Sequence, residues 1–377
     1  MKYAVNNYSS IRQVTKGIST VALMSLMISV STATLAQENL SVSHSSQQNN
    51  ASGTATVLSE ADRASAQSRL PMLTSLDQLP ANARKALGLD NADGVVSNAY
   101  GSGAWPFTTK RYGPAWDSKG KELKKSFRPL TGKLWMRFGE SWYVCTASVI
   151  DKNLLVTAAH CVHNYGQMGS GLADEVVFEA ARHEKKAKAK TWKALDWYIP
   201  SVYYNGNDTC TSPGVVCEND IAIVVIDNKK GIADKLKGHF NYAVDDYSYT
   251  SFMDGECTQI TQLGYPVALD GGVRMIRTDS LGCQDAPSNV VIGSDQTGGS
   301  SGGPWFVNFG TDYVSASSTP TDAAMNIMAV TSWGYTSNSI KIQGSSRFAR
   351  NTTYTSESNI SSLHGSACSD YPTACYP

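Results

Sequence analysis

The stretch TGGSSGGPW, Thr297 to Trp305, holds four glycines and two adjacent serines and ends in proline and tryptophan. Glycine adopts backbone conformations that other residues avoid, so this composition predicts a sharp turn around a serine. Such a turn also directs backbone N–H groups into one cavity. A flexible Gly/Ser linker is the alternative, but Pro304, Trp305 and Phe306 must pack against other residues, which places the turn inside a folded domain.

Short apolar runs lie on both sides of this turn from Lys133 onward. Gly, Asn, Asp and Pro separate the runs, as in KLWMRFG, WYVCTASVI, NLLVTAAHCV, IAIVVID and IMAVTSWGY. Runs of this length and composition are typical of β-strands. Many short strands without a long helical repeat predict an all-β barrel or sandwich.

Two of these runs adjoin side chains capable of acid–base chemistry. In TAAHC, residues 157–161, His160 precedes Cys161, and a disulfide between Cys145 and Cys161 would fix the backbone at the histidine. A general base needs such a fixed position. In ENDIAIVVID, Asp220 stands at the start of an apolar strand. It is either a turn residue or a carboxylate that orients an imidazole.

A metal site at His160, Cys161 and His163 is the competing interpretation of this histidine. Zinc sites require deprotonated thiolates and usually a CxxC or HExxH spacing, and neither spacing occurs in the sequence. We therefore predict no metal and no cofactor.

The motifs TAAHC, NDIAIV and GGSSGGP occur in this order and are followed by SWG at Ser332 to Gly334. Together they resemble the chymotrypsin/trypsin clan of serine endopeptidases, over about residues 130 to 350. The resemblance implies an all-β fold of two packed antiparallel β-barrels with the active site between them. It also implies that Ser301 is the nucleophile, that His160 is the general base and that Asp220 orients the imidazole, with an acyl-enzyme intermediate.

The same resemblance assigns the groups that hold the substrate. The N–H groups of Gly299 and Ser301 would form the oxyanion hole. Ser332 to Gly334 would pair with the substrate backbone as an added strand. Asp295 occupies the position whose carboxylate selects Lys or Arg in the trypsin pattern, and Gly334 leaves the pocket mouth open to a long side chain.

Departures from the clan's pattern point to a secreted bacterial branch. Ser300 replaces the aspartate that binds the new N-terminus in animal enzymes, and Thr297 replaces a familiar cysteine. With GYP at residues 264–266, these features resemble the glutamyl endopeptidase (V8-like) enzymes. That branch has a histidine where this chain has Thr331. The preferred substrate residue stays open, and we rank basic ahead of acidic ahead of broad preference.

The N-terminus and the cysteines predict export. Basic residues precede an apolar stretch, Gly17 to Val30, and small residues precede a cut after Ala36, so residues 1–36 are typical of a signal peptide. The apolar stretch is shorter than the roughly 20 residues of a membrane-spanning helix. All eight cysteines lie at or after Cys145, and an even count is typical of disulfides in an oxidising compartment. We expect a secreted or periplasmic protein with no membrane association after signal removal.

Composition divides the remaining chain into three parts. Residues 37–120 lack cysteine and open with SVSHSSQQNNASGTA, a tract too polar to order its own backbone. Leucines at 70, 73, 76, 79, 87 and 89 then predict one or two small amphipathic helices. We interpret 37–120 as a pro-segment, 121–365 as the trypsin-like protease domain and 366–377 as a cysteine-containing tail. The simplest pairing joins the remaining cysteines as neighbours: Cys210 with Cys217, Cys257 with Cys283, and Cys368 with Cys375.

The charge balance indicates no polyanionic partner. Lys and Arg together number 32, as do Asp and Glu, so the formal net charge is zero and we predict no nucleic-acid binding. We expect a monomer that acts on proteins or peptides. The alternative hypothesis is a catalytically silent protease homologue that serves as a binding module. Silent homologues usually lack a triad residue, and this chain retains all three.

Overall fold

The computed structural model describes residues 40–47, 58–74, 106–112, 130–180, 191–245, 250–252, 255–285, 289–310, 326–337 and 339–377. These residues belong to one compact unit, Asn39–Pro377. The predicted signal peptide, residues 1–36, lies outside the described residues.

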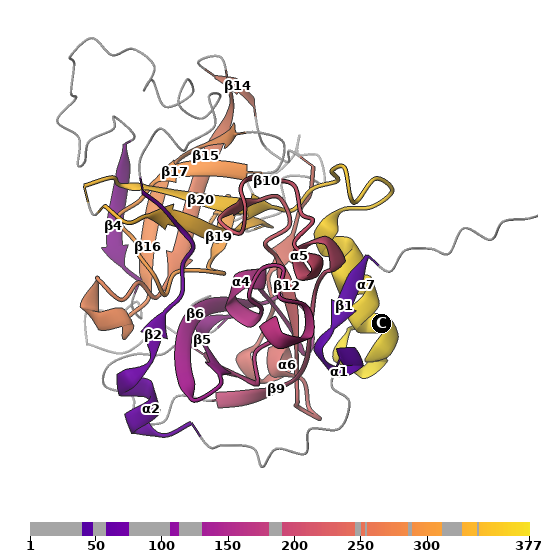
Figure 1. The fold of residues 1–377 in the computed structure, drawn as a ribbon. Helices are drawn as coiled ribbons and strands as arrows, with labels where there is room; N and C mark the ends of the chain where they lie inside the picture. The colour runs from indigo at the N-terminus through magenta and orange to yellow at the C-terminus, as the bar shows by residue number, and fades with distance from the viewer. Residues whose placement is uncertain are drawn as a thin grey trace, which may run out of the picture. The chain divides into compact units, whose positions relative to one another are not determined.

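Six antiparallel strands form a first closed barrel (Figure 1). They pair in the order β9-β12-β7-β6-β5-β8, and β8 pairs again with β9 to close the ring. The strands are β5 (Thr131–Phe138), β6 (Ser141–Val149), β7 (Leu154–Thr157), β8 (Glu175–Ala180), β9 (Thr191–Pro200) and β12 (Ala222–Ile226).

Six further antiparallel strands form a second closed barrel. Their order is β15-β18-β19-β20-β17-β16, and the β15–β16 pairing closes the ring. The strands are β15 (Gly255–Gly264), β16 (Ile276–Asp285), β17 (Asn289–Gly293), β18 (Pro304–Val307), β19 (Asn326–Tyr335) and β20 (Ile342–Arg347). The predicted fold of two packed antiparallel barrels is therefore confirmed.

The two barrels share one apolar core. Leu155 and Ile223 of the first barrel and Leu263 and Phe306 of the second belong to the same cluster of buried side chains, each with 0% exposure. Burying a large apolar side chain stabilises a fold by about 1.5–3 kcal/mol, so this common core holds the barrels against each other.

The C-terminal helix α7 (Asn359–Asp370) packs on the first barrel, against β9 and β12. Ser358 caps its N-terminus, and Ile360, Leu363 and Ala367 recur at a spacing of three and four residues on its buried side. The predicted boundary between protease domain and tail, at residues 365 and 366, falls inside this helix.

The remaining described elements are short. The helices are α1 (His44–Gln47), α2 (Glu60–Ser65), α4 (Ala159–Val162), α5 (Ser201–Asn205) and α6 (Ile232–Leu236), and the 3-10 helices are η3 (Met168–Gly171), η4 (Asp270–Gly272) and η6 (Pro372–Ala374). The short strands are β1 (Ser41–Ser43), β2 (Gln67–Ser68), β3 (Met72–Leu73), β4 (Phe107–Arg111), β10 (Cys210–Ser212), β11 (Val216–Cys217), β13 (Asn241–Tyr242) and β14 (Thr250–Phe252).

All eight cysteines form disulfides. The pairs are Cys145–Cys161, Cys210–Cys217, Cys257–Cys283 and Cys368–Cys375. The pairing of sequence neighbours suggested by proximity is therefore confirmed. Cys257 and Cys283 lie opposite each other on β15 and β16, so strand register brings them together.

Two predictions for the N-terminal region are wrong where the structure describes it. Ser41–Ser43 of the polar tract forms β1. Its backbone is ordered by antiparallel pairing with β9, a partner that the composition of the tract does not reveal. Leu70 and Leu73 do not lie in a helix, since the chain around them is extended and Leu73 belongs to β3. Both barrels offer this segment strand edges, and edge pairing overrides the helical leucine spacing. The leucines at 76, 79, 87 and 89 lie outside the described residues.

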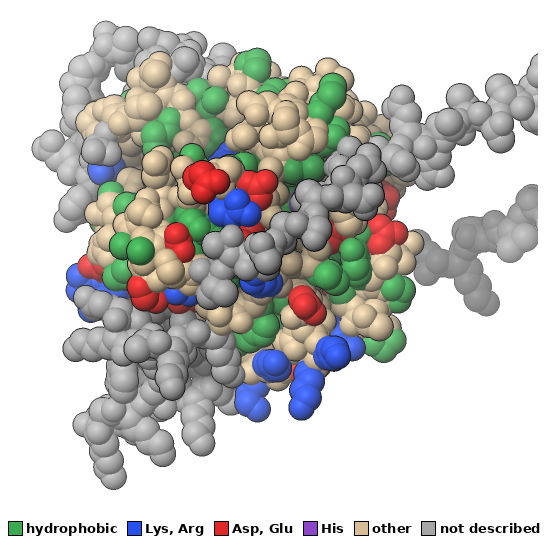
Figure 2. Space-filling model, turned by 60° about the horizontal axis from the view of Figure 1, so that its bottom comes forward, with side chains coloured by type: hydrophobic (Ala, Val, Ile, Leu, Met, Phe, Trp, Pro, Cys, Tyr) green, Lys and Arg blue, Asp and Glu red, His purple; other side chains and the backbone are tan. Residues whose placement is uncertain are grey.

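No helix in the described part of the chain is both long and apolar enough to cross a membrane. Acidic and basic side chains are interspersed among neutral ones on the face that Figure 2 shows. This distribution agrees with the zero formal net charge of the sequence.

Candidate active site

The three residues of the predicted triad come from both barrels. His160 lies in α4, directly after β7, and Asp220 directly precedes β12, so both belong to the first barrel. Ser301 lies in the turn between β17 and β18 of the second barrel. The backbone of Thr146 on β6 donates to the carbonyl of Ser301 over 2.7 Å, which ties this turn to the first barrel.

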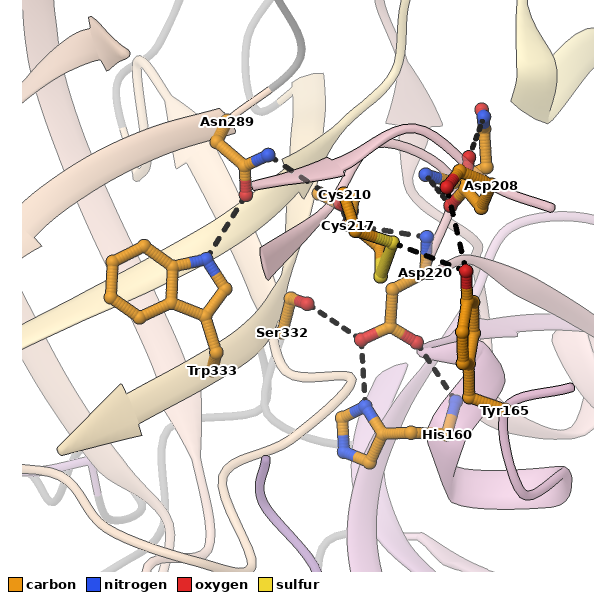
Figure 3. Close-up of a disulfide and its surroundings, with 11 residues drawn as sticks. His160, Tyr165, Asp208, Cys210, Cys217, Asp220, Asn289, Ser332 and Trp333 are labelled. Atoms are coloured by element: carbon orange, nitrogen blue, oxygen red, sulfur yellow. Dashed lines mark hydrogen bonds and ion pairs between the residues drawn. A yellow bond between two sulfur atoms is a disulfide. The ribbon is translucent and has the colours of Figure 1, made fainter. Parts of the chain in front are cut away.

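The Asp220 carboxylate holds both the imidazole and the backbone of His160 (Figure 3). Nδ1 lies 2.7 Å from Oδ2, and the backbone N–H of His160 donates to Oδ1 over 2.8 Å. Both residues are buried, with 4% and 1% exposure. A carboxylate that accepts the Nδ1 proton leaves Nε2 as the basic nitrogen of the ring.

Two hydroxyl groups fix the Asp220 carboxylate and backbone from the second barrel. Ser332 Oγ on β19 donates to Oδ2 over 2.6 Å, and the Asp220 N–H donates to Ser346 Oγ on β20 over 3.3 Å. The Ser332 side chain thus contacts the triad carboxylate (Figure 3). The Ser332 hydroxyl therefore fixes the orientation of the carboxylate, and Ser346 fixes the backbone that carries it.

The segment before Asp220 is anchored by a second buried carboxylate. Asp208 accepts from the backbone N–H of Asn219 over 2.8 Å and from its side-chain amide over 2.7 Å. Burial raises the pKa of Asp208 to about 6, although these hydrogen bonds act in the opposite direction. The Cys210–Cys217 disulfide closes the loop between the two acids. Asn219 is therefore fixed beside the triad.

Glu218 is a buried acid without a hydrogen-bond partner among the described residues. It is 2% exposed, and neither carboxylate oxygen accepts a hydrogen bond there. Burial, helped by the charge of Asp208, raises the pKa of Glu218 to about 7, while Arg347 acts in the opposite direction. The folded protein consequently retains a proton that the unfolded chain releases near pH 4.5.

We expect Glu218→Gln to stabilise the protein near pH 8 relative to the wild type but not near pH 4. Because the pKa of Glu218 is higher in the folded state, the wild type has its full free energy of unfolding below pH 4.5. It loses part of that free energy as the pH rises toward about 7, whereas glutamine does not ionise. The difference should be about 3 kcal/mol, and urea unfolding at both pH values measures it. The exposed Glu140→Gln variant controls for the loss of one charge. An equal effect of Glu218→Gln at both pH values would contradict the prediction.

The glycines around Ser301 permit close approach of neighbouring backbone. Gly299 has a φ of +98°, and a Cβ there would lie 2.5 Å from the Tyr265 carbonyl oxygen. Gly302 has a φ of +73°, and a Cβ there would overlap Thr157 Oγ1. Within the described part of the chain, the backbone N–H groups of Gly299 and Ser301 donate to no other backbone group.

A pocket beside the turn contains some of the predicted substrate-binding residues. Asp295 and Gly334 line it, together with Lys341. The Asp295 carboxylate accepts from Thr109 Oγ1 over 2.6 Å. Thr331 does not line the pocket, because it is fully buried and its hydroxyl bonds Gln262 and Trp305. Acidic and basic groups both line the pocket, so charge alone does not select a substrate residue.

A buried amide network that includes part of the pocket wall was not predicted from the sequence. Gln343 is 1% exposed, its Oε1 lies 2.5 Å from Gln262 Nε2, and its Nε2 lies 3.2 Å from Ser300 Oγ. Ser294 Oγ donates to Gln262 Oε1 over 2.8 Å. Gln262 lies on β15, Gln343 on β20 and Ser294 directly after β17, and no local motif marks them. Together they hold Ser300, the residue before Ser301.

The cysteines beside His160 do not provide metal ligands. Cys145, His160 and Cys161 bring potential ligand atoms close together, but both sulfurs belong to the Cys145–Cys161 disulfide. A disulfide offers no thiolate, so the competing interpretation of this cluster as a zinc site lacks the chemistry that it needs. His163 Nε2 instead donates to the Met168 carbonyl over 2.8 Å.

A family model described as Trypsin matches residues 119–354. The chain belongs to the trypsin family. The match includes His160, Asp220 and Ser301, and it covers both barrels. The protein is therefore a serine peptidase, and its substrates are peptides or proteins.

Solved structures with a similar fold are also proteases, and no curated protein matches the sequence. The thermostable serine protease AL20 from an extremophilic microorganism shares 23% identity, covering 62% of this chain and 97% of that one with a TM-score of 0.46. The protease Anisep from Arthrobacter nicotinovorans shares 21% identity, covering 66% and 100% with a TM-score of 0.47. A Glu endopeptidase shares 17% identity, covering 67% and 93% with a TM-score of 0.44. The resemblance of this chain to the V8-like branch stays a prediction.

Proposed function

We propose that this member of the trypsin family is an exported endopeptidase that cuts proteins through Ser301, His160 and Asp220. The signal peptide and pro-segment predicted from the sequence belong to this proposal, as does the monomeric state. The observation that carries it is the buried His160–Asp220 pair, with Nδ1 2.7 Å from the carboxylate and a further hydroxyl from Ser332 on the same oxygen. A protein that only binds peptides needs no such pair, so the silent homologue is not favoured.

Acylation begins when Ser301 Oγ attacks the carbonyl carbon of the peptide. His160 Nε2 takes the serine proton, and the Asp220 carboxylate stabilises the imidazolium that forms. The N–H groups of Gly299 and Ser301 bind the oxyanion of the tetrahedral intermediate. His160 then returns the proton to the leaving nitrogen, the C–N bond breaks, and an ester joins the acyl group to Ser301.

Deacylation repeats these steps with water as the nucleophile. His160 takes a proton from the water, whose oxygen attacks the ester carbon, and the same two N–H groups bind the second oxyanion. Collapse of this intermediate returns the proton to Ser301 Oγ and releases the carboxylic acid product. The enzyme leaves the cycle unchanged, and no cofactor is needed.

Labelling with a serine-directed fluorophosphonate tests the proposal. We expect the processed protein to form one adduct that peptide mapping places on Ser301, because only the activated hydroxyl attacks phosphorus rapidly. A His160→Ala variant keeps the serine but lacks the base, so it should label at least a hundredfold more slowly. A folded, processed protein that hydrolyses no denatured protein and gives no adduct would support the binding module instead.

We expect Gly299→Ala to lower kcat by about 10²–10³-fold, with a smaller change in KM. The added Cβ would meet the Tyr265 carbonyl at 2.5 Å and would disfavour the φ of +98°, so the Gly299 N–H would leave its position. Steady-state hydrolysis of a peptide substrate measures the change. Gly310→Ala is the matched control, since that glycine also has a positive φ but has open space around a Cβ. Equal losses in both variants would contradict the role of Gly299.

A further inference from the structure

The segment that contains β2 and β3 pairs with both barrels. β2 runs parallel to β6, with Gln67 opposite Tyr143 and Ser68 opposite Val144. β3 runs parallel to β19, with Met72 opposite Gly334 and Leu73 opposite Tyr335. Figure 1 shows the indigo chain of α2 and β2 beside β6. Residues 67–73 therefore pass from the first barrel to the second across the candidate active site.

This segment occupies the strand edge predicted for the substrate backbone. The Gly334 N–H donates to the Pro71 carbonyl over 3.0 Å, and the Thr336 N–H donates to the Leu73 carbonyl over 3.0 Å. On the first barrel, the Arg69 N–H donates to the Val144 carbonyl over 3.3 Å. A substrate strand cannot pair with Gly334 while these hydrogen bonds persist.

The backbone of Arg69 lies directly on the candidate nucleophile. Ser301 Oγ donates its hydrogen bond to the Arg69 carbonyl oxygen over 2.5 Å, and Ser301 is 0% exposed. Attack requires the carbonyl carbon to face Oγ and the oxygen to face the N–H groups of Gly299 and Ser301. Here the oxygen faces Oγ and accepts the proton that His160 would have to take. The contact blocks the serine without presenting a bond that it can cut.

The Arg69 side chain anchors the segment on the first barrel. Its guanidinium lies over the rings of Phe138 and Tyr143, 4.1 and 5.3 Å from their centroids. Its Nη2 donates to Asn164 Oδ1 over 2.7 Å. The planar guanidinium thus stacks on two aromatic rings and also donates a hydrogen bond. Neither lysine nor alanine would reproduce both contacts.

Leucines that follow Arg69 in the chain fill the second barrel's half of the cleft. Leu73 is 1% exposed and packs in the cluster that contains Trp333. Leu70 lines the pocket with Asp295, and one of its methyl carbons lies 3.0 Å from the position of a Cβ on Gly334. The pocket that would receive a substrate side chain is already partly occupied.

We infer that residues 67–73 form an internal inhibitor that holds the enzyme inactive until the segment leaves the cleft, with Arg69 as its anchor. This inference rests on the proposed function of Ser301. It assigns to one short segment, with β2 and β3 at its ends, the inhibition that the predicted pro-segment would need. The groups of the inhibitor that the cleft recognises are the guanidinium of Arg69 and, after the proline at position 71, two apolar side chains.

The test compares how fast a small fluorophosphonate labels Ser301 in the intact full-length chain. Wild type, Arg69→Glu and Leu73→Asp are treated for short times, and intact mass confirms that no cleavage has occurred. We expect labelling at least tenfold faster in both variants, because each removes one anchor of the strand while leaving the barrels unchanged. Arg111→Ala is the matched control, since that arginine pairs with Asp270 and its side chain is 63% exposed. It should label at the wild-type rate.

The possible results separate this inference from the proposed function. Equal labelling of the wild type and both cleft variants, at a rate typical of an active serine enzyme, would overturn the inhibitor while leaving the function intact. No adduct in any chain, and none after the leader has been removed, would overturn the function itself. Thermal unfolding of each variant shows whether the barrels remain folded, so a folded Leu73→Asp with unchanged labelling also counts against the inhibitor.

Discussion

Replacement of Ser301 by alanine should lower kcat for peptide hydrolysis by about 10⁶-fold, the largest effect that we expect from any single change. The variant has no oxygen that can form the acyl-enzyme, so only binding and the Gly299 and Ser301 N–H groups remain to assist attack by water. The measurement is hydrolysis of a fluorogenic peptide by protein from which the leader has been removed. Mapping of new peptide ends from a denatured protein mixture adds the substrate preference.

Ser300→Ala is the matched control for this experiment. The two serines are adjacent, but the Ser300 hydroxyl donates to the Thr297 carbonyl over 2.7 Å and accepts from Gln343 Nε2 over 3.2 Å. It is held within the loop, so its loss should cost less than about tenfold in kcat. A Ser300→Ala variant as inactive as Ser301→Ala, or a Ser301→Ala variant that retains more than a hundredth of the activity, would contradict the assignment.

Local patterns in the sequence predicted an all-β barrel or sandwich, and the resemblance of the motifs to the chymotrypsin/trypsin clan added the two barrels and the positions of the triad. Alternating and continuous apolar runs mark strands such as Leu154–Thr157 and Ala222–Ile226, since buried strands need side chains of this type. His160 and Asp220 stand next to those two strands, which pair with each other in the first barrel. Because β7 and β12 pair with each other, the residues at their ends, His160 and Asp220, are brought close together.

The rest depends on contacts between distant segments, which no local pattern reveals. Gln262 and Gln343 meet only because β15 and β20 lie in one barrel, and glutamine by itself indicates no site. The segment at Arg69 has an apolar spacing that favours helix, yet the edges of β6 and β19 bind it as a strand. Intrinsic preference is weak compared with the backbone pairing and burial that those edges supply.

Replacement of Asp220 by asparagine should lower kcat by about 10⁴-fold while the fold stays intact. Oδ1 accepts the backbone N–H of His160, so the amide oxygen of the variant must take that position. The amide NH₂ then takes the position of Oδ2 and faces Nδ1, which lies 2.7 Å from Oδ2 in the wild type. Nδ1 must become an acceptor, which puts the ring proton on Nε2. That tautomer cannot take a proton from Ser301.

Kinetics and labelling together identify this cause. Asp220→Asn should lose kcat and the rate of fluorophosphonate labelling in parallel, since both need a basic Nε2. Asp208→Asn is the matched control, because Asp208 is also buried but bonds Asn219 over 2.7 Å rather than the imidazole. It should lose stability and keep kcat within about tenfold. An Asp220→Asn enzyme within tenfold of the wild type would mean that the carboxylate does not set the tautomer of His160.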